Sequence, residues 1–195
     1  IDEVIDESKK YWNTYNIYEI LYSTFNDEDR AIFSVNGIDK YEHFFNAWQG
    51  HATLDYVTIL TKGIGYYKAK INKKLRGLGN NTDKAEKKYT FYRSLLIVLD
   101  GLELLIQRYI NLCKKTSAAT HPGDVNLPKI NRLLKTFEKM LSGPPENFYQ
   151  AIEYVNFFNA LDGFDNAGRI DQYLYPFYQA DVKKGIVDDQ IAEEL

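Results

Sequence analysis

Apolar residues along most of the chain recur every three or four positions, the pattern of helices with one buried face. The longest such run predicts a helix from Thr82 or Asp83 to about Lys115, which corresponds to a length of roughly 45 Å or more. Its predicted buried stripe comprises Phe91, Leu95, Val98, Leu102, Leu105, Tyr109 and Leu112, widened by Leu99 and Ile106. We therefore expect Leu102, a central member of this stripe, to be fully buried.

The same periodicity predicts further helices on both sides of this one. They cover residues 1–10, 54–78 (capped by Thr53 and interrupted by Gly63 and Gly65), 127–141, 147–161, 176–185 and 188–195. Residues 24–49 are less regular, and Ile32-Phe33-Ser34-Val35 is a candidate short strand. No stretch alternates with period two for long enough to build a sheet. The prediction is a mainly α fold in one unit, residues 1–195, with few or no strands.

Composition narrows the classes of protein to which the chain can belong. The net charge of −3 shows no basic surplus, so the composition does not indicate nucleic-acid binding. The apolar stretches are too short to span a membrane, and the first residues do not resemble a signal peptide. The single cysteine, Cys113, predicts a buried structural thiol in a reducing compartment. We therefore expect a cytoplasmic protein with no membrane or nucleic-acid partner.

The usual catalytic and metal-binding motifs are absent from the sequence. It contains no Glu-x-x-His pair, no phosphate-binding glycine loop and no Gly-x-Ser-x-Gly elbow. We therefore predict no metal site and no bound cofactor in this chain.

Two short regions remain as candidates for chemistry. His51 and Asp55 are four residues apart, so a helix reaching back to His51 would pair them for binding or acid–base work; capping or a surface pair is the alternative. In the second region a polar loop leads into Arg169, Asp171 and Gln172 among several aromatic residues. Charges in so aromatic a setting are expected to be buried and paired, as a structural network.

The second region also resembles a known motif. Gly168-Arg169-Ile170-Asp171-Gln172-Tyr173-Leu174-Tyr175-Pro176-Phe177-Tyr178 resembles the G-R-x-D-Q-Y-x-Y-P-[FY]-Y motif of the pyruvate formate-lyase-like glycyl radical enzymes. Pro144-Pro145-Glu146-Asn147-Phe148-Tyr149-Gln150-Ala151-Ile152 is similar to their N-P-P-R-T-F-Y-E-A-L. Gly50-His51-Ala52-Thr53-Leu54-Asp55-Tyr56 resembles their G-H-x-x-x-D-Y, with Lys62-Gly63 following as their Lys-Gly does. Order and spacing agree over nearly the whole chain.

The resemblance implies a fold, an activity and a site. Members of this family are ten-stranded α/β barrels wrapped in helices, in which a glycyl radical, installed by an activating enzyme, generates a cysteine thiyl radical for anaerobic metabolism. Cys113 lacks the family's G-C-x-E context, and no R-V-x-G-[YF] loop is present. The implied substrate-binding residues are Trp48, Gln49, His51, Asp55, Phe164 and Asn166. Ala47 and Gly163-Phe164 replace polar residues of polyol-acting members, which implies a less polar substrate.

Two hypotheses follow from these observations. The first is the helical N-terminal segment of a glycyl radical lyase, dehydratase or decarboxylase, inactive alone; both ends read as if they lie within helices, as in a fragment. Its expected partners are the rest of the parent chain, a small-molecule substrate and the activating enzyme, with a second copy in a homodimer as a further option. The second hypothesis is a stand-alone helical binding or regulatory module derived from that scaffold.

Overall fold

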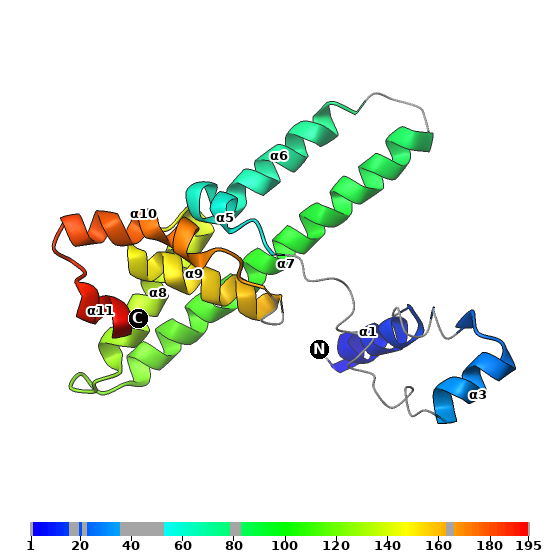
Figure 1. Cartoon of the computed structure of the whole chain (residues 1–195), viewed down its shortest axis with the longest axis horizontal. Coiled ribbons are helices and arrows are strands. Elements are labelled where there is room, and N and C mark those ends of the chain that lie inside the picture. Colours follow the sequence, from blue (N-terminus) through cyan, green and yellow to red (C-terminus); the bar gives the residue numbers. More distant parts are fainter. Residues whose placement is uncertain are drawn as a thin grey trace. The chain divides into compact units, whose positions relative to one another are not determined.

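The computed structural model describes residues 2–15, 20, 23–35, 53–78, 83–162 and 166–194. All regular elements in these ranges are α-helices, which confirms the mainly α prediction (Figure 1). The chain divides into two compact units, Ile1–Ala52 and Thr53–Leu195, which are described separately below. The expectation of one unit over the whole length stays a prediction.

The first unit contains α1 (Asp2–Tyr15), as predicted, and α3 (Asp27–Val35). The predicted strand at residues 32–35 is wrong, because those residues form the last turn of α3. The helix is set at its start: the Asp29 N–H donates to Asn26 Oδ1 at 2.9 Å, and the Asn26 N–H donates to Asp29 Oδ2 at 3.4 Å. This reciprocal capping, together with acidic residues in the first turn, outweighs the strand preference of a short apolar run.

The second unit begins with α5 (Tyr56–Lys62) and α6 (Ile64–Arg76), where one interrupted helix was predicted. The break lies at Gly63, whose φ of 70° is in the left-handed region. A Cβ at Gly63 would lie 2.8 Å from the carbonyl carbon of Gly143, so only glycine fits against that turn. The residue that caps α5 is Asp55, not Thr53 as predicted.

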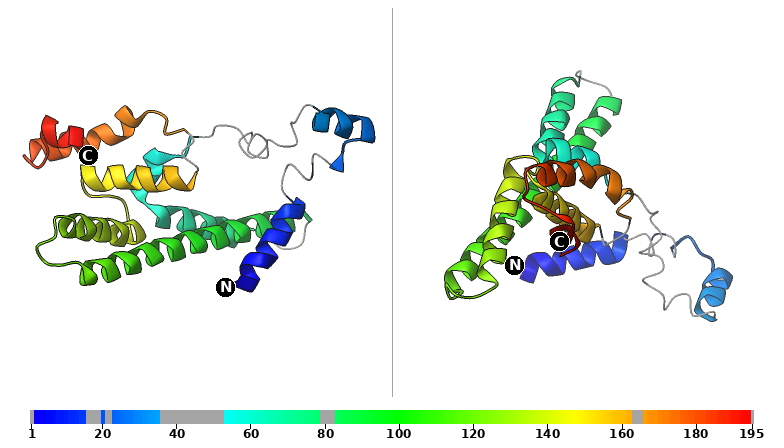
Figure 2. Two further views of the ribbon diagram at one scale, coloured as in Figure 1. Left: turned by 90° about the horizontal axis from the view of Figure 1, so that it is seen from below. Right: turned by 60° about the vertical axis from the view of Figure 1, so that its left-hand side comes forward.

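Two long helices follow, α7 (Asp83–Ala119) and α8 (Leu127–Ser142), close to their predicted bounds. Pro128 lies in the first turn of α8, where its missing N–H costs no hydrogen bond. The first part of α7 runs beside α6, and the last part runs beside α8 (Figures 1 and 2).

The predicted buried stripe of α7 is only partly correct. Phe91, Val98 and Leu112 are 59%, 67% and 56% exposed, and Leu102 is half-buried rather than fully buried. Ile106, predicted to widen the stripe, is fully buried, and the other buried side chains lie on its side of the helix: Leu96, Ile110 and Cys113. Because α7 carries apolar residues over a wide arc, the packing of α6 and α8 decides which part of the arc is covered.

The chain then forms α9 (Phe148–Leu161), α10 (Ile170–Lys183) and α11 (Asp189–Glu194). Asn147 caps α9, since its Oδ1 accepts the Gln150 N–H at 2.9 Å. Asp188 caps α11 in the same way through the Ile191 N–H at 2.8 Å.

Helix α10 begins at Ile170, six residues before the predicted start at Pro176. A proline inside a helix removes one backbone hydrogen bond, so other contacts must hold the turn that precedes it. Tyr173 packs against the core cluster and Leu174 is buried within it. This packing extends the helix through the proline.

The core of the second unit lies between α5, α7, α8, α9 and α10. Its largest fully buried apolar side chains are Tyr56, Leu60, Ile106, Met140 and Tyr154. The Tyr154 hydroxyl donates to the Gly143 carbonyl at 2.9 Å, so the polar tip of this buried ring is satisfied. In the described part of the chain, no helix combines the length and apolar character that crossing a membrane requires.

Candidate functional site

The two sequence regions singled out for chemistry meet in the fold. Gly168 has a φ of 65°, and a Cβ on it would lie 2.7 Å from Thr53 Cγ2, so the loop before α10 packs directly on the segment before α5. Next to this contact the Tyr56 and Tyr173 rings stack at a centroid distance of 5.1 Å. Segments more than 100 residues apart in sequence are therefore held together by a glycine contact and a ring stack.

Asp55 is held in place by its role as helix cap. Its Oδ1 accepts the Thr58 N–H at 3.0 Å, and the side chain is exposed. Hydrogen bonds from the Thr58 side chain and backbone lower the pKa of Asp55, and Lys70 and Lys62 add to this. Because α5 begins at Tyr56, Asp55 is positioned as a cap and not as a member of a helix face. The result is a carboxylate that stays charged and is available for binding.

The loop on the other side of the contact is held by three short hydrogen bonds. Asn166 Oδ1 accepts the Gly168 N–H at 2.8 Å, and the Tyr173 hydroxyl donates to the Ala167 carbonyl at 2.6 Å. The Ile170 N–H donates to the Gly168 carbonyl at 3.1 Å. Asn166 is exposed, and its amide nitrogen has no hydrogen-bond partner among the described residues. This group is therefore free to contact a ligand.

The other predicted pocket residues lie outside the described residues: Trp48, Gln49, His51 and Phe164, together with Ala47 and Gly163. Their assignment to a substrate pocket stays a prediction. The structure brings together the segments that hold Asp55 and Asn166, and these two residues are the described members of the predicted set.

The predicted buried network of Arg169, Asp171 and Gln172 is wrong in its burial. Arg169 Nε and Nη2 donate to the two Asp171 carboxylate oxygens at 2.9 and 2.6 Å, so the pair forms as expected. The two side chains are, however, 69% and 63% exposed, and Gln172 is exposed too. Since α10 starts at Ile170, these residues lie around its first turn and face solvent. The hydrogen bond with Arg169 lowers the pKa of Asp171.

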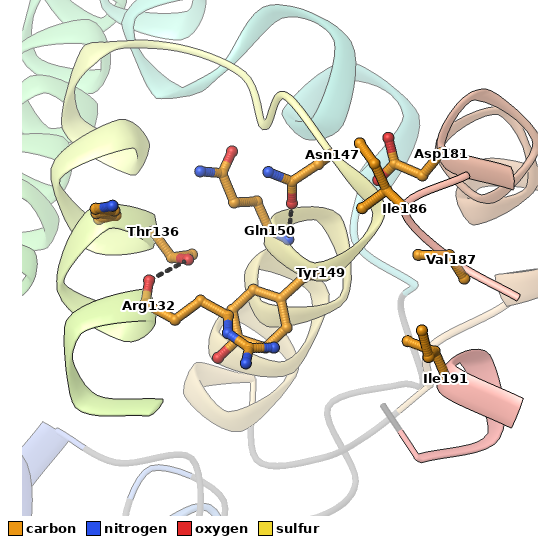
Figure 3. A pocket seen from close by; sticks show the side chains of 10 residues that line it. Arg132, Thr136, Asn147, Tyr149, Gln150, Asp181, Ile186, Val187 and Ile191 are labelled. Carbon is orange, nitrogen blue, oxygen red and sulfur yellow. Dashed lines mark hydrogen bonds between the residues drawn. The ribbon is translucent and has the colours of Figure 1, made fainter. Parts of the chain in front are cut away.

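A pocket of about 340 Å³, elsewhere in the second unit, was not predicted from the sequence (Figure 3). It lies among α8, α9 and the segment from the end of α10 to α11. Figure 3 shows Arg132 lying over the Tyr149 ring, at 4.7 Å from its centroid, and Ile186, Val187 and Ile191 on the other side. Sequence reasoning missed it because the lining residues come from separate helices with no shared motif. Among the described residues no cluster of His, Cys, Asp and Glu suited to a metal ion occurs.

Glu153, on α9, has an ionisation set by its surroundings. Burial raises the pKa of its carboxyl group, although Tyr149 and Arg132 act in the opposite direction. A folded-state pKa above the unfolded value means that the stability contributed by this group is largest at low pH and falls as pH rises through the folded pKa.

Glu153→Gln is therefore expected to flatten the dependence of stability on pH in the weakly acidic range and to raise stability at neutral pH. Urea unfolding of the variant and the native protein over a pH series measures this difference. An equal slope for both proteins would show that the carboxyl titrates normally.

Comparison with known proteins identifies the family to which this chain is similar. A sequence profile described as pyruvate formate lyase-like matches residues 1–195. The (2S)-3-sulfopropanediol dehydratase of Klebsiella oxytoca is 24% identical over 98% of this chain and 24% of its own length. The trans-4-hydroxy-L-proline dehydratase of Clostridioides difficile is 30% identical over 71% of this chain and 18% of its own length. The glycerol-bound B12-independent glycerol dehydratase of Clostridium butyricum superposes with a TM-score of 0.72 at 21% identity, over 91% of this chain and 23% of that one.

The isethionate sulfite-lyase of Bilophila wadsworthia is 25% identical over 96% of this chain and 24% of its own length. The helical scaffold with two motif-bearing segments in contact is thus that of the glycyl radical enzymes, and these relatives are dehydratases and lyases. This chain belongs to the pyruvate formate lyase-like family. It spans about a quarter of the length of the curated relatives that it matches over nearly its whole length.

Proposed function

We propose that this chain is the N-terminal scaffold of a glycyl radical enzyme and contributes part of the substrate pocket. The observation that carries this proposal is the contact of Gly168 with Thr53, which packs the Gly-Arg-x-Asp-Gln loop on the Gly-His-x-x-x-Asp-Tyr segment. This contact brings two family motifs that are distant in sequence to the same part of the fold. Irregular segments held rigidly by helices are where binding residues concentrate.

In this proposal the chain binds and orients the substrate but does not perform the radical step. A glycyl radical and a cysteine, both supplied by the rest of the parent protein, would provide the hydrogen-abstraction chemistry, so the chain alone is inactive. Asp55 is exposed and its pKa is lowered, so its carboxylate would accept a hydrogen bond from a substrate hydroxyl or amine. The free Asn166 amide would donate to a substrate oxygen, and His51 would complete this polar side.

The reaction class that fits is a radical elimination, by a dehydratase, lyase or decarboxylase. The relatives are named for sulfopropanediol, isethionate and hydroxyproline, small molecules with a hydroxyl group. Ala47 and Phe164 take the place of polar residues in polyol-acting members, so the proposed substrate is less polar than glycerol. Trp48 and Gln49 would complete the wall of the proposed substrate pocket.

The proposed setting is the cytoplasm of a cell in anaerobic metabolism. A reducing compartment suits a chain with a single cysteine, and radical chemistry requires protection from oxygen. The proposed partners are the remaining parent chain, the radical-activating enzyme and, in a homodimer, a second copy.

The test compares turnover with stability in the full-length protein. His51→Ala and Asp55→Asn are expected to reduce kcat/KM by about 100-fold or more, as does the loss of a well-placed polar group in an active site. Asn caps a helix about as well as Asp, so Asp55→Asn leaves the free energy of unfolding within about 0.5 kcal/mol.

Asp171→Asn is the matched control, because it changes a carboxylate that is exposed and lies outside the proposed pocket. Its turnover is expected to stay within about twofold of the native value. Unchanged turnover in His51→Ala and Asp55→Asn would remove both residues from the pocket.

The alternative is a helical binding or regulatory module without catalysis. It is favoured by one observation, that α5 to α10 enclose a core of their own, with Tyr56, Ile106 and Tyr154 at most 2% exposed. A module of this kind would bind a partner or small molecule without turnover.

A further inference from the structure

The charges of the chain are unevenly distributed. Residues 62–93, here called the basic arm, contain ten Lys and Arg but only two acidic residues. The other 163 residues contain fourteen Lys and Arg against twenty-five Asp and Glu. A strongly positive segment is thus built into a protein whose net charge is −3, which the overall composition conceals.

In its described part the basic arm comprises Lys62 at the end of α5, α6 and the beginning of α7. Helix α6 and the beginning of α7 lie side by side and extend away from α8 to α10 (Figures 1 and 2). One of its cations is neutralised: Lys68 Nζ lies 2.6 Å from Asp100 and 2.8 Å from Glu103. Within the described ranges, none of the other nine Lys and Arg residues of the arm forms an ion pair, and all nine are exposed. The arm therefore presents uncompensated positive charge to its surroundings.

A groove of about 300 Å³ runs between the two helices of the arm. Its floor is aromatic and aliphatic and its edge is cationic: it is lined by Tyr67, Lys70, Ile71, Lys74, Tyr92 and Leu95. The exposed Phe91 ring lies beside the groove, with its centroid 5.7 Å from that of Tyr92. An apolar floor with a charged edge is the composition of a protein-binding surface, in which the floor supplies burial and the edge supplies steering.

The floor also has the spacing of a helix-pairing surface. Phe91, Leu95 and Val98 follow one another at intervals of four and three residues along α7, as in the seam between two paired helices. Phe91 and Val98 are 59% and 67% exposed. Leu95 is half-buried in the groove beside α6, while Phe91 and Val98 remain open to a further helix.

We propose that this groove binds an acidic amphipathic helix presented by a partner protein. The apolar face of that helix would cover Tyr67, Tyr92 and the exposed Phe91 and Val98, and its carboxylates would meet Lys70 and Lys74. The charge outside the arm favours a short acidic helix over nucleic acid or an anionic membrane. The rest of the second unit (residues 53–61 and 94–195) contains ten Lys and Arg against fifteen Asp and Glu. An extended polyanion would run onto this excess negative charge, whereas a single helix contacts the arm alone.

The test uses the full-length protein and a fluorescent synthetic peptide. Leucines in the peptide are spaced three and four residues apart and glutamates fill the other positions. Fluorescence anisotropy is expected to show binding that weakens as salt is added. A peptide of the same composition, scrambled so that its leucines share no face, is expected to bind at least about tenfold more weakly.

Matched variants locate the site. Lys70→Glu with Lys74→Glu is expected to weaken peptide binding by about tenfold or more, and Phe91→Ser with Val98→Ser by a similar factor. Lys129→Glu with Lys183→Glu makes the same change of net charge at exposed positions of α8 and α10, and is expected to change the Kd by less than about twofold. Circular dichroism checks that each variant keeps its helix content.

Three results would overturn the proposal. One is equal binding of the ordered and scrambled peptides, which would show that the arm attracts acidic peptides through its net positive charge alone. Another is tighter binding of a DNA duplex or of phosphatidylserine vesicles than of the peptide. The third is no binding at all in the full-length protein, which would show that the rest of the parent chain covers the groove.

Discussion

Gly63→Ala is expected to destabilise the fold by roughly 2–5 kcal/mol, the sum of a left-handed backbone cost and a steric overlap. Gly63 joins α5 to α6 at a φ of 70°, and an added Cβ would lie 2.8 Å from the Gly143 carbonyl carbon and 3.0 Å from the Pro144 nitrogen. These are backbone atoms, which cannot rotate away as a side chain does. The turn after α8 would therefore have to move, and the core around Tyr154 with it, since the Tyr154 hydroxyl binds that turn.

Gly65→Ala is the matched control for this prediction. Gly65 lies two residues further on, within α6, and a Cβ there would meet nothing within 4 Å. Alanine at this position is expected to stabilise the helix by about 0.5–1 kcal/mol. Urea unfolding of both variants gives the comparison, and a similar effect for both would show that Gly63 is not required for the contact with the turn.

Asp181→Ala is expected to cost roughly 2–4 kcal/mol, because it removes a charged acceptor from a buried backbone donor. Asp181 is 1% exposed, and its Oδ2 accepts the Phe148 N–H at 2.8 Å, so the end of α10 caps the start of α9. The carboxylate also lies at the positive end of the α9 dipole. Its loss would separate two helices that both contribute to the core.

Two neighbouring variants distinguish this role from the ion pair with Lys184. Lys184 Nζ is 3.4 Å from Asp181 Oδ1, and the lysine side chain is 56% exposed, so Lys184→Ala is expected to cost less than about 1 kcal/mol. Asp181→Asn keeps an oxygen for the Phe148 N–H and is expected to fall between the other two. If Lys184→Ala cost as much as Asp181→Ala, the ion pair and not the cap would be the source of stability.

Helices whose signals are local were predicted well from the sequence. The bounds of α7, α8 and α9 follow from apolar periodicity and from caps that lie next to the helix, such as Asn147. The short apolar run at residues 32–35 made a strand a candidate there, whereas the caps at Asn26 and Asp29, several residues earlier, set a helix.

Features set by tertiary contacts could not be predicted from local sequence signals. The choice of covered face on α7 depends on where α6 and α8 pack, and the role of Asp181 depends on a helix more than 30 residues away. The exposure of Arg169 and Asp171 depends on the start of α10, which tertiary packing moved ahead of Pro176. The aromatic residues that neighbour Arg169 and Asp171 in sequence therefore do not bury these two side chains in the fold.

The substrate-binding residues implied by the family resemblance come from two segments more than 100 residues apart in sequence. The Gly168–Thr53 contact and the Tyr56–Tyr173 stack hold these segments together. The pocket residues outside the described part remain predictions that rest on the same resemblance.

The reading frame that follows the codon for Leu195, determined by sequencing the gene or its transcript, tests the central claim most directly. A glycyl radical enzyme requires that the frame continue for several hundred residues, through a loop with the Gly-Cys-x-Glu pattern to a C-terminal Arg-Val-x-Gly-[Tyr/Phe] loop. A stop codon directly after Leu195 would contradict the account and leave the helical binding module as the function of this chain.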